Sequence, residues 1–206
     1  MAERGGDPGP GDIPATYGRQ AKSWDAGRSR ALFERRWLDR MSEGFGPGAT
    51  ILDLGCGGGE PIADYLLGRD FALTGVDIAP EMLELARRRF PRAEWIEADM
   101  RGLALGRRFD AVLAWNSFFH LDPAAQRAMF AVFSALLAPG GRLLFTTGPA
   151  AGIAIGRVGD EQVYHSSLSP AQYAALIEAN GMAVRAFVAQ DPDCAGHSVW
   201  LARRAA

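Results

Sequence analysis

Residues 51–61 read Ile-Leu-Asp-Leu-Gly-Cys-Gly-Gly-Gly-Glu-Pro, and this stretch decides the fold. Its first four residues have the pattern of a buried strand, and a cluster of glycines follows directly. The apolar spacing from Ile62 to Leu67 then predicts a helix. Glycines let the backbone turn tightly and approach a ligand closely, and the helix N-terminus beyond them offers free N–H groups. The stretch therefore predicts a nucleotide-binding turn between a strand and a helix.

Length and composition predict one soluble globular domain. The chain has 206 residues, of which 48% are hydrophobic and 22% charged, and its formal net charge is -2. A dedicated nucleic-acid binder would carry a basic face, and a membrane span would need about 18 consecutive apolar residues. The two cysteines lack zinc-ligand spacing and fit a reducing compartment. We expect a cytoplasmic protein, monomer or homodimer, with no metal, no nucleic-acid partner and no membrane contact.

The order of the expected elements predicts an α/β fold. Residues 1–12, rich in Gly and Pro, are expected to form a disordered tail, and residues 13–48 a helical cap with helices over 15–25 and 29–43. From residue 49 to 206, strands and helices alternate as in a doubly wound sheet. Strands are expected over 50–54, 71–77, 93–97, 109–115, 142–147, 182–190 and 198–202, and helices over 59–67, 80–90, from 123 to the stop at Pro139, and 170–179. Between them, residues 148–167 are expected to be a long loop and a candidate lid.

Five motifs resemble those of the class I S-adenosylmethionine-dependent methyltransferases, and the likeness extends from about Tyr17 to the C-terminus. They are LDLGCGGGEP at 52–61, VDIAPEML at 76–83, EADM at 97–100, FDAVLAWNSFFHL at 109–121 and LAPGGRLLF at 137–145. The resemblance implies a Rossmann-like, doubly wound, seven-stranded sheet whose last strand is antiparallel. It also implies an N-terminal helical cap over an S-adenosylmethionine-binding domain of residues 49–206.

The glycine spacing itself separates two classes of cofactor. A dinucleotide turn uses GxGxxG, but here Glu60 stands at the third glycine position and Pro61 follows it. The pattern GxGxG suits a ligand without a pyrophosphate. Asp77 ends the second strand, where a carboxylate can accept hydrogen bonds from both ribose hydroxyls. In the family, an acid at the position of Asp99 accepts from the adenine amino group, and the backbone N–H of Met100 donates to the ring.

The predicted cofactor is S-adenosyl-L-methionine, with S-adenosyl-L-homocysteine as product. Asp53 either meets the methionine ammonium or caps the N–H groups of the loop, and both readings stay open. Ile78 likewise either packs on the adenine or belongs to the core. The predicted cofactor-binding residues are Tyr17, Asp53, Gly55, Cys56, Gly57, Gly59, Asp77, Ile78, Met82, Asp99, Met100 and Trp115.

The end of the fourth strand is expected to carry the acceptor, because ligands of open α/β sheets bind beyond the carboxyl ends of the strands. Methyl transfer from a sulfonium is an in-line displacement, so a base is needed only where the acceptor must lose a proton. His120 and then His165 are the candidate bases, and a structural role stays open for each. The predicted substrate-binding residues are Trp24, Asn116, Phe118, Phe119 and Tyr164.

These patterns predict an enzyme that moves a methyl group from S-adenosylmethionine to an O, N or C atom of a small molecule. One alternative is a non-catalytic S-adenosylmethionine-binding module, because cofactor motifs can survive the loss of chemistry. The other is a nicotinamide-dependent oxidoreductase, against which Glu60 and Asp99 speak.

Overall fold

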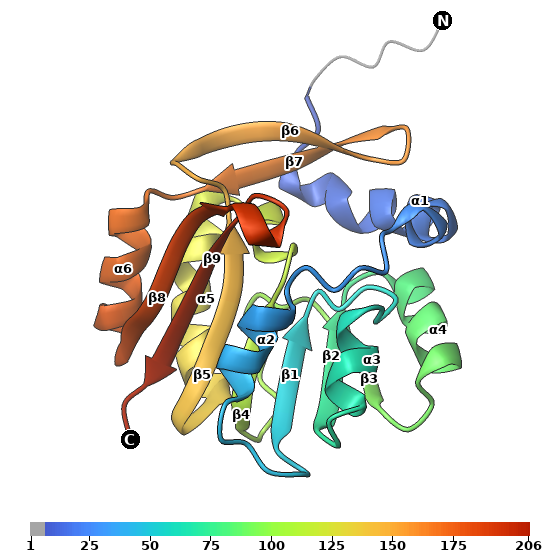
Figure 1. Ribbon diagram of the computed structural model, residues 1–206. Coiled ribbons are helices and arrows are strands. Elements are labelled where there is room, and N and C mark those ends of the chain that lie inside the picture. The colour runs from blue at the N-terminus through green and yellow to red at the C-terminus, as the bar shows by residue number, and fades with distance from the viewer. Residues whose placement is uncertain (1–6) are drawn as a thin grey trace, which may run out of the picture.

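A computed structural model describes residues 7–206, and a seven-stranded sheet forms its centre (Figure 1). The strand order is β3-β2-β1-β4-β5-β9-β8, with β1 to β5 parallel and β9 antiparallel to both of its neighbours. The predicted sheet with its antiparallel last strand is thereby confirmed. The strands are β1 (Thr50–Leu54), β2 (Ala72–Asp77), β3 (Glu94–Glu97), β4 (Phe109–Ala114), β5 (Leu137–Thr147), β8 (Met182–Asp191) and β9 (His197–Arg204).

Helices cover both faces of the sheet (Figure 1). On one face α2 (Arg35–Ser42), α3 (Ile62–Leu67) and α4 (Pro80–Arg89) pack against inward side chains such as Ile51 and Leu113. On the other face α5 (Pro123–Leu136) and α6 (Pro170–Ala179) pack against side chains such as Leu52 and Val112. Neighbouring residues of one strand thus enter different cores, because successive side chains of a strand point to opposite faces. A sheet buried on both faces explains why the central strands read as continuous apolar runs.

The N-terminal segment differs from expectation at both of its predicted helices. The first, α1 (Ile13–Gly27), is longer than predicted, and a short 3-10 helix, η1 (Pro10–Asp12), precedes it. The predicted disordered tail is wrong at residues 10–12, which form this turn, and its first six residues lie outside the described part. The second helix begins at Arg35 rather than at residue 29, because the chain must cross from α1 to the sheet, which leaves Phe33 48% exposed. The division into a cap of 13–48 and a domain of 49–206 stays a prediction.

Residues 148–167 form a β-hairpin, so the expectation of a long loop was wrong. Strands β6 (Gly152–Val158) and β7 (Glu161–Ser167) pair antiparallel as a separate two-stranded sheet. Two residues join them, and the first, Gly159, has φ +59. Two-residue turns with positive φ match the twist of paired strands. Exposed small residues in β6 concealed this pattern, because the strand lacks a clear apolar face.

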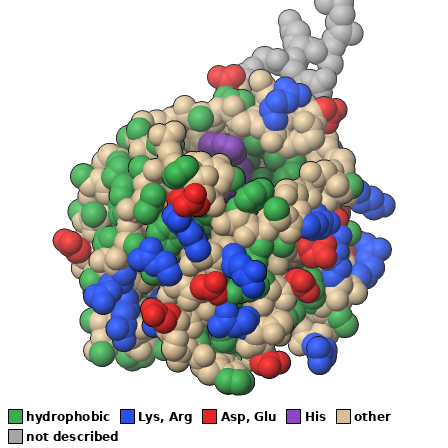
Figure 2. Space-filling model, in the orientation of Figure 1, with side chains coloured by type: hydrophobic (Ala, Val, Ile, Leu, Met, Phe, Trp, Pro, Cys, Tyr) green, Lys and Arg blue, Asp and Glu red, His purple; other side chains and the backbone are tan. Residues whose placement is uncertain are grey.

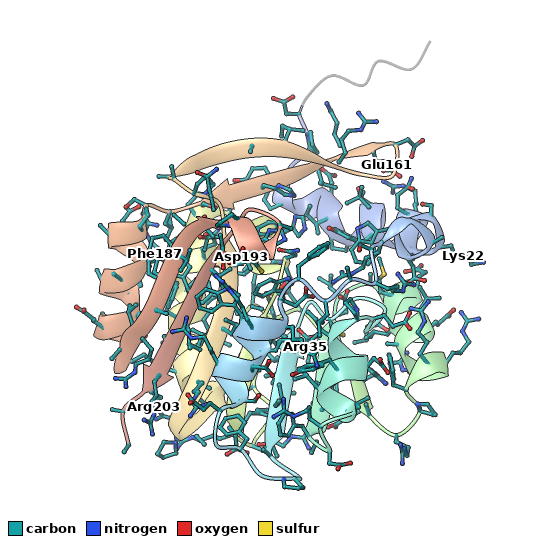
Figure 3. The ribbon with its side chains drawn as sticks, viewed as in Figure 1. Lys22, Arg35, Glu161, Phe187, Asp193 and Arg203 are labelled. Carbon is teal, nitrogen blue, oxygen red and sulfur yellow. The ribbon has the colours of Figure 1, made fainter. Side chains whose placement is uncertain are left out.

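The hairpin and α1 together cover the carboxyl ends of the parallel strands (Figure 1). Glu161, labelled in Figure 3 at the hairpin, pairs with Arg19 of α1 at 2.5 Å. Gln20 donates to Asp160 at 2.7 Å. These contacts close the end of the sheet where ligands of α/β folds bind.

Candidate functional site

A pocket lies at the carboxyl ends of β1, β2, β3 and β4, beneath α1. It brings together nine of the predicted cofactor-binding residues, together with Trp24, Asn116 and His120. The nine are Tyr17, Gly55, Gly57, Asp77, Ile78, Met82, Asp99, Met100 and Trp115. The other three predicted cofactor-binding residues do not line the pocket but lie behind its lining residues. They are Asp53, Cys56 and Gly59. Side chains that are far apart in the sequence thus converge on a single pocket.

The glycine turn is shaped by close packing as well as by the pocket. Gly55 has φ +73, and a Cβ there would stand 2.2 Å from the Cβ of Ser117. Gly59 has φ +86, and a Cβ there would stand 3.0 Å from the ring of Phe90. A Cβ on Gly57 would stand 3.8 Å from the indole of Trp24, in ordinary contact with it. Any side chain would therefore push the turn away from the end of β4 and from α4, or fill the space under α1.

Asp77 fastens the glycine turn to the loop after β2. Its carboxylate accepts hydrogen bonds from the backbone N–H of Gly57 at 2.8 Å and of Ala79 at 2.9 Å. Burial raises the pKa of this carboxyl, while the backbone N–H donors lower it. Carboxylate oxygens accept more than one hydrogen bond each. Asp77 therefore retains capacity for hydroxyl donors of a ligand in the pocket.

Asp53 and Arg28 carry opposite charges next to the glycine turn. Asp53 is only 3% exposed, and no side chain or backbone N–H of the described residues donates to its carboxylate. Burial raises the pKa of Asp53 to about 7, and the positive charge of Arg28 partly offsets this effect. The guanidinium of Arg28 lies 4.7 Å over the ring of Trp24, and burial lowers its pKa.

Sequence reasoning missed Arg28, which lines the pocket. The residue stands in the linker after α1, where a basic side chain carries no local signal. Within residues 7–206 its guanidinium makes no hydrogen bond or ion pair. The sequence of the linker alone could not show that this side chain turns toward Asp53.

Asp99 lies beyond β3 and is engaged by a neighbour on its own loop. Arg101 contacts the carboxylate of Asp99 at 2.5 to 3.0 Å, and the side chain of Asp99 stays 35% exposed. Met100 extends from this loop toward the glycine turn, with its methyl 3.5 Å from the position of a Cβ on Gly55. The loop therefore closes the pocket at the end opposite to Arg28.

His120 is held by partners on both ring nitrogens. Its Nδ1 lies 3.0 Å from the carbonyl oxygen of Tyr164, which can only accept, so Nδ1 carries the proton. Its Nε2 then accepts from the hydroxyl of Tyr17 at 2.9 Å. Burial lowers the pKa of His120 to about 4. His120 is therefore a neutral ring that orients Tyr17, and its lone pair is already occupied.

The other candidate base lies outside the pocket. His165, on β7, packs its ring against those of His120 and Phe119 at 4.8 and 4.7 Å between centroids. The hairpin presses close here, because a Cβ on Gly156 would stand 2.5 Å from the ring of His165. His165 thus supports the underside of the hairpin.

Three predicted substrate residues take packing positions instead. Phe118 is fully buried and packs against Phe130, Phe133 and Phe145, because the short helix η2 (Phe118–His120) turns its side chain into the core. Phe119 packs on the two histidine rings. Tyr164 is 7% exposed and offers its carbonyl to His120. None of the three lines the pocket, and a substrate contact for these side chains stays a prediction.

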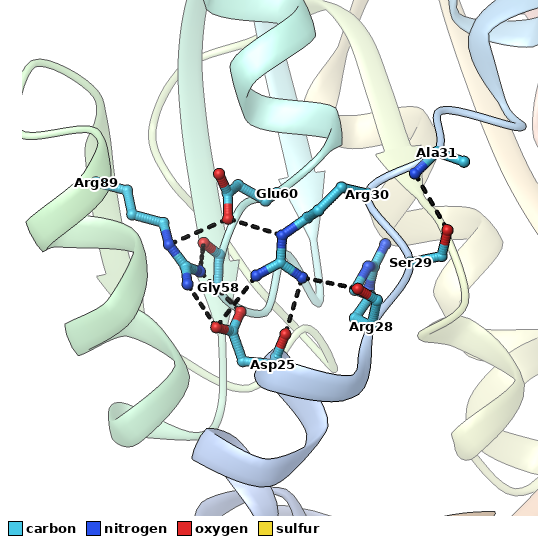
Figure 4. A network of polar contacts seen from close by, with 8 residues as sticks. All are labelled: Asp25, Arg28, Ser29, Arg30, Ala31, Gly58, Glu60 and Arg89. Carbon is cyan, nitrogen blue, oxygen red and sulfur yellow. Dashed lines mark hydrogen bonds and ion pairs between the residues drawn. The ribbon is translucent and has the colours of Figure 1, made fainter.

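An ionic network ties α1 to the glycine turn (Figure 4). Arg89 of α4 pairs with Asp25 at 2.5 Å and with Glu60 at 3.2 Å. Arg30 pairs with Glu60 at 3.0 Å and with Asp25 at 3.3 Å. Asp25 is 8% exposed, but the side chains of Arg30 and Glu60 are 40% and 31% exposed, so only the Asp25 end of the network is shielded from water. Glu60, at the position of the missing third glycine, thus anchors the helix that covers the pocket.

A helical membrane span and a metal site each place requirements on the described residues. Among residues 7–206, no helix is long and apolar enough to cross a membrane. The same residues contain no group of three or more His, Cys, Asp and Glu side chains arranged to hold a metal ion.

Comparisons with known proteins agree with the geometry. Residues 51–141 match the family described as Methyltransferase domain. A ubiquinone biosynthesis O-methyltransferase from Xanthomonas axonopodis pv. citri is 30% identical over 160 residues, 66% of this chain and 63% of the relative. A dTDP-3-amino-3,6-dideoxy-alpha-D-glucopyranose N,N-dimethyltransferase from Streptomyces fradiae is 38% identical over 79 residues, 38% of this chain and 31% of the relative. The chain thus spans less than two thirds of these curated relatives.

Solved structures share the fold. An amino pentose methyltransferase from Micromonospora echinaspora, solved with S-adenosylmethionine bound, superposes with a TM-score of 0.71. The sequences are 24% identical, and the match covers 90% of this chain and 96% of that one.

Proposed function

We propose that this chain, a member of the class I S-adenosylmethionine-dependent methyltransferases by its domain match and its fold, transfers a methyl group from S-adenosylmethionine to a small molecule. The acceptor atom is O, N or C. The observation that carries the proposal is the distribution of charge in one pocket. The guanidinium of Arg28 and the carboxylates of Asp77 and Asp99 line the pocket, and the buried carboxylate of Asp53 lies behind its wall next to the glycine turn. This arrangement matches a zwitterionic amino acid joined to a nucleoside.

The residues of the pocket divide by the part of the cofactor that they would hold. Asp77 accepts from the ribose hydroxyls, and Asp99 with Met100 binds the adenine, against which Ile78 and Met82 pack. Asp53 meets the ammonium of the methionine part, and Arg28 meets its carboxylate. Charges that are shielded from water attract one another strongly. Asp53 and Arg28 together therefore favour a ligand that carries both an ammonium and a carboxylate over a ligand with only one of these groups.

Alignment and exclusion of water are the main tasks left to the protein. S-adenosylmethionine supplies an activated methyl group whose sulfonium departs without further activation. Tyr17, oriented by His120, and Trp24 close the pocket from α1, and the ionic network holds this helix in place. Because the lone pair of His120 is occupied, we assign it to positioning rather than to proton removal.

Relatives support a small-molecule acceptor. The relative from Streptomyces fradiae is named for a dimethylation of an amino sugar nucleotide, and the one from Xanthomonas for ubiquinone biosynthesis. We infer a cytoplasmic location, since Cys56 and Cys194 are both free thiols and fit a reducing compartment. A monomer or homodimer stays a prediction.

Calorimetry with S-adenosylhomocysteine tests the binding step. We expect saturable binding of this product and none of NADH. Asp77→Ala removes acceptors for the ribose and should weaken binding by about 1–3 kcal/mol, or roughly 5- to 150-fold. Asp64→Ala, an exposed change on α3, is the matched control. Unchanged affinity in Asp77→Ala, or binding of NADH alone, would contradict the proposal.

Transfer of a labelled methyl group tests the chemical step. A protein that binds S-adenosylhomocysteine but transfers no label to any pool of small metabolites would be a binding module. Label found in small molecules, and lost in Asp77→Ala, supports the enzyme.

A further inference from the structure

A second pocket adjoins the first across a shared wall. Trp24, Arg28, Trp115 and Asn116 line both pockets, so the two spaces meet at the end of β4. The face drawn in Figure 2 shows a hollow with histidine surface recessed in it. The second pocket is completed by residues from the α1 linker, the hairpin turn and the β8–β9 turn. These residues include Ser23, Gly27, Ser29, Ala31, Phe33, Glu34, Pro61, Gly159, Ala195 and His197.

Glu34 brings a buried carboxylate to this second pocket. The residue is 4% exposed, and its carboxylate forms no ion pair or hydrogen bond with another residue of the described chain. Burial raises the pKa of Glu34, while its own backbone N–H and the charge of Arg28 lower it. Among residues 7–206, the only hydrogen-bond donor to this carboxylate is its own backbone N–H, so the carboxylate keeps acceptor capacity, and its place in a pocket wall indicates a ligand that donates to it.

His197 brings a hydrogen-bond donor of fixed tautomer. The hydroxyl oxygen of Thr146 accepts from the backbone N–H of Asn116 at 2.8 Å, so its proton is free to bond Asn116 Oδ1 at 3.2 Å. The amide nitrogen of Asn116 then donates to His197 Nε2 at 3.2 Å. Nε2 is therefore the acceptor, and Nδ1 carries the proton. Burial and the charge of Arg28 lower the pKa of His197, which keeps the ring neutral.

Asn116 links Thr146 to His197 in a hydrogen-bond relay, and its own backbone conformation is uncommon. Its φ is +51, in the left-handed region that non-glycine residues rarely adopt. Such strain persists where surrounding contacts fix it, and it gathers at functional sites. The Nδ1–H of His197 has no hydrogen-bond partner among residues 7–206. Every fully buried side-chain nitrogen or oxygen in these residues has a hydrogen-bond partner, so Nδ1 of His197 is not fully buried and remains accessible. The relay thus presents one donor to the second pocket.

We propose that the second pocket is the methyl-acceptor site and that it takes a small amine which carries a hydrogen-bond acceptor near its nitrogen. Glu34 holds the amine, and His197 Nδ1–H donates to the neighbouring acceptor. The guanidinium of Arg28 already lies over the ring of Trp24, so the indole of Trp115 is the aromatic face that favours a ligand cation over a neutral hydroxyl. This proposal rests on the proposed function, which supplies the methyl donor in the adjoining pocket.

The transfer balances with Glu34 as proton acceptor. The bound ammonium gives one proton to the Glu34 carboxylate, which frees the nitrogen lone pair. That pair forms the new N–C bond, and the C–S bond breaks with its electron pair left on sulfur. The products are an N-methylated ammonium and S-adenosylhomocysteine, and Glu34 then returns its proton to water. The raised pKa of Glu34 suits this role, because a carboxylate in water would take the proton poorly.

Thermal unfolding with matched ligand pairs tests the amine assignment. The protein saturated with S-adenosylhomocysteine is heated with millimolar ethanolamine or ethylene glycol, and with glucosamine or glucose, so that each amine carries a hydroxyl acceptor next to its nitrogen-bearing carbon. At least one amine should raise the Tm, and its alcohol partner should not, because a ligand that binds the folded state stabilises it. Equal responses to amine and alcohol, or no response to either amine, would overturn the proposal.

Variants locate the response. Glu34→Gln should abolish the amine response and leave the affinity for S-adenosylhomocysteine within twofold, whereas Glu178→Gln, on the exposed face of α6, should retain it. If Glu34→Gln unfolds, Glu34→Met serves in its place, since it fills the same space without a charge. An amine response that survives loss of the Glu34 charge refutes the site.

Nitrogen-15 NMR of the histidine rings provides an independent test. We expect His197 as the Nδ1–H tautomer, with its signals moved by the responding amine. Protonation at Nε2 would refute the role of His197. Failure of S-adenosylhomocysteine to bind would instead refute the proposed function, so the two failures are distinguishable.

Discussion

Asp53→Asn is expected to stabilise the cofactor-free protein and to weaken cofactor binding at the same time. In the unfolded chain this carboxyl ionises near its usual pKa of 3.8, whereas burial raises its pKa to about 7 in the folded protein. Between these values the folded state keeps a proton that the unfolded state has lost. The free energy of unfolding therefore falls as pH rises from about 4 to about 7, and the full loss is present above that range.

The magnitude follows from the two pKa values. Their difference corresponds to about 4 kcal/mol at about 1.36 kcal/mol for each tenfold change. Asparagine carries no charge and escapes this cost. The gain in unfolding free energy should thus approach about 4 kcal/mol at pH 8 as an upper bound, and should nearly vanish at pH 4.

Ligand binding should show the opposite preference. The ammonium of the cofactor requires the ionised carboxylate, which makes up about a tenth of the molecules at pH 6 and about nine tenths at pH 8. The affinity of the native protein for S-adenosylhomocysteine should therefore rise about tenfold over this range. Asp53→Asn should bind more weakly and without this pH dependence.

Urea unfolding at pH 4 and pH 8, with calorimetry at pH 6 and pH 8, measures both effects. Asp64→Asn, exposed on α3, is the control and should change neither. The reasoning is refuted if Asp53→Asn is less stable than the native protein at pH 8. It is equally refuted if the native affinity does not change with pH.

Three further changes probe the supports of the pocket. Tyr17→Phe removes the hydroxyl that donates a hydrogen bond to His120 Nε2. Calorimetry should show that the binding free energy of S-adenosylhomocysteine becomes less favourable by about 0.5–1.5 kcal/mol. Phe118→Ala empties a fully buried site in the aromatic core, and urea unfolding should show a loss of about 3–5 kcal/mol, which a role confined to substrate contact would not produce. Arg89→Met removes the closer of the two arginine partners of Asp25 and leaves Arg30, so α1 is held less firmly. Protease cleavage within α1 should become faster and binding weaker by about 1–3 kcal/mol, whereas unchanged cleavage would exclude an anchoring role of Arg89.

The central strands and their order of appearance were predictable from the sequence, and the reason is local. Strands such as Thr50–Leu54 are apolar runs between turn residues, and a parallel sheet buried on both faces needs such runs. The helix start at Ser169-Pro170 was predictable too, because the Ser169 hydroxyl accepts from the N–H of Gln172. The hairpin at 152–167 was not, since its first strand is exposed and has no apolar face.

The sequence by itself determined the class of fold and the glycine turn with Asp77, because these depend on residues close in the chain or joined by one strand and one helix. Only the tertiary structure decided what the side chains around the turn do. His120 loses its freedom as a base to Tyr17, 103 residues away, and Phe118 enters the core. Arg28 reaches toward Asp53 from a linker. Such roles depend on which distant elements pack together, and that packing leaves no trace in the local pattern of the chain.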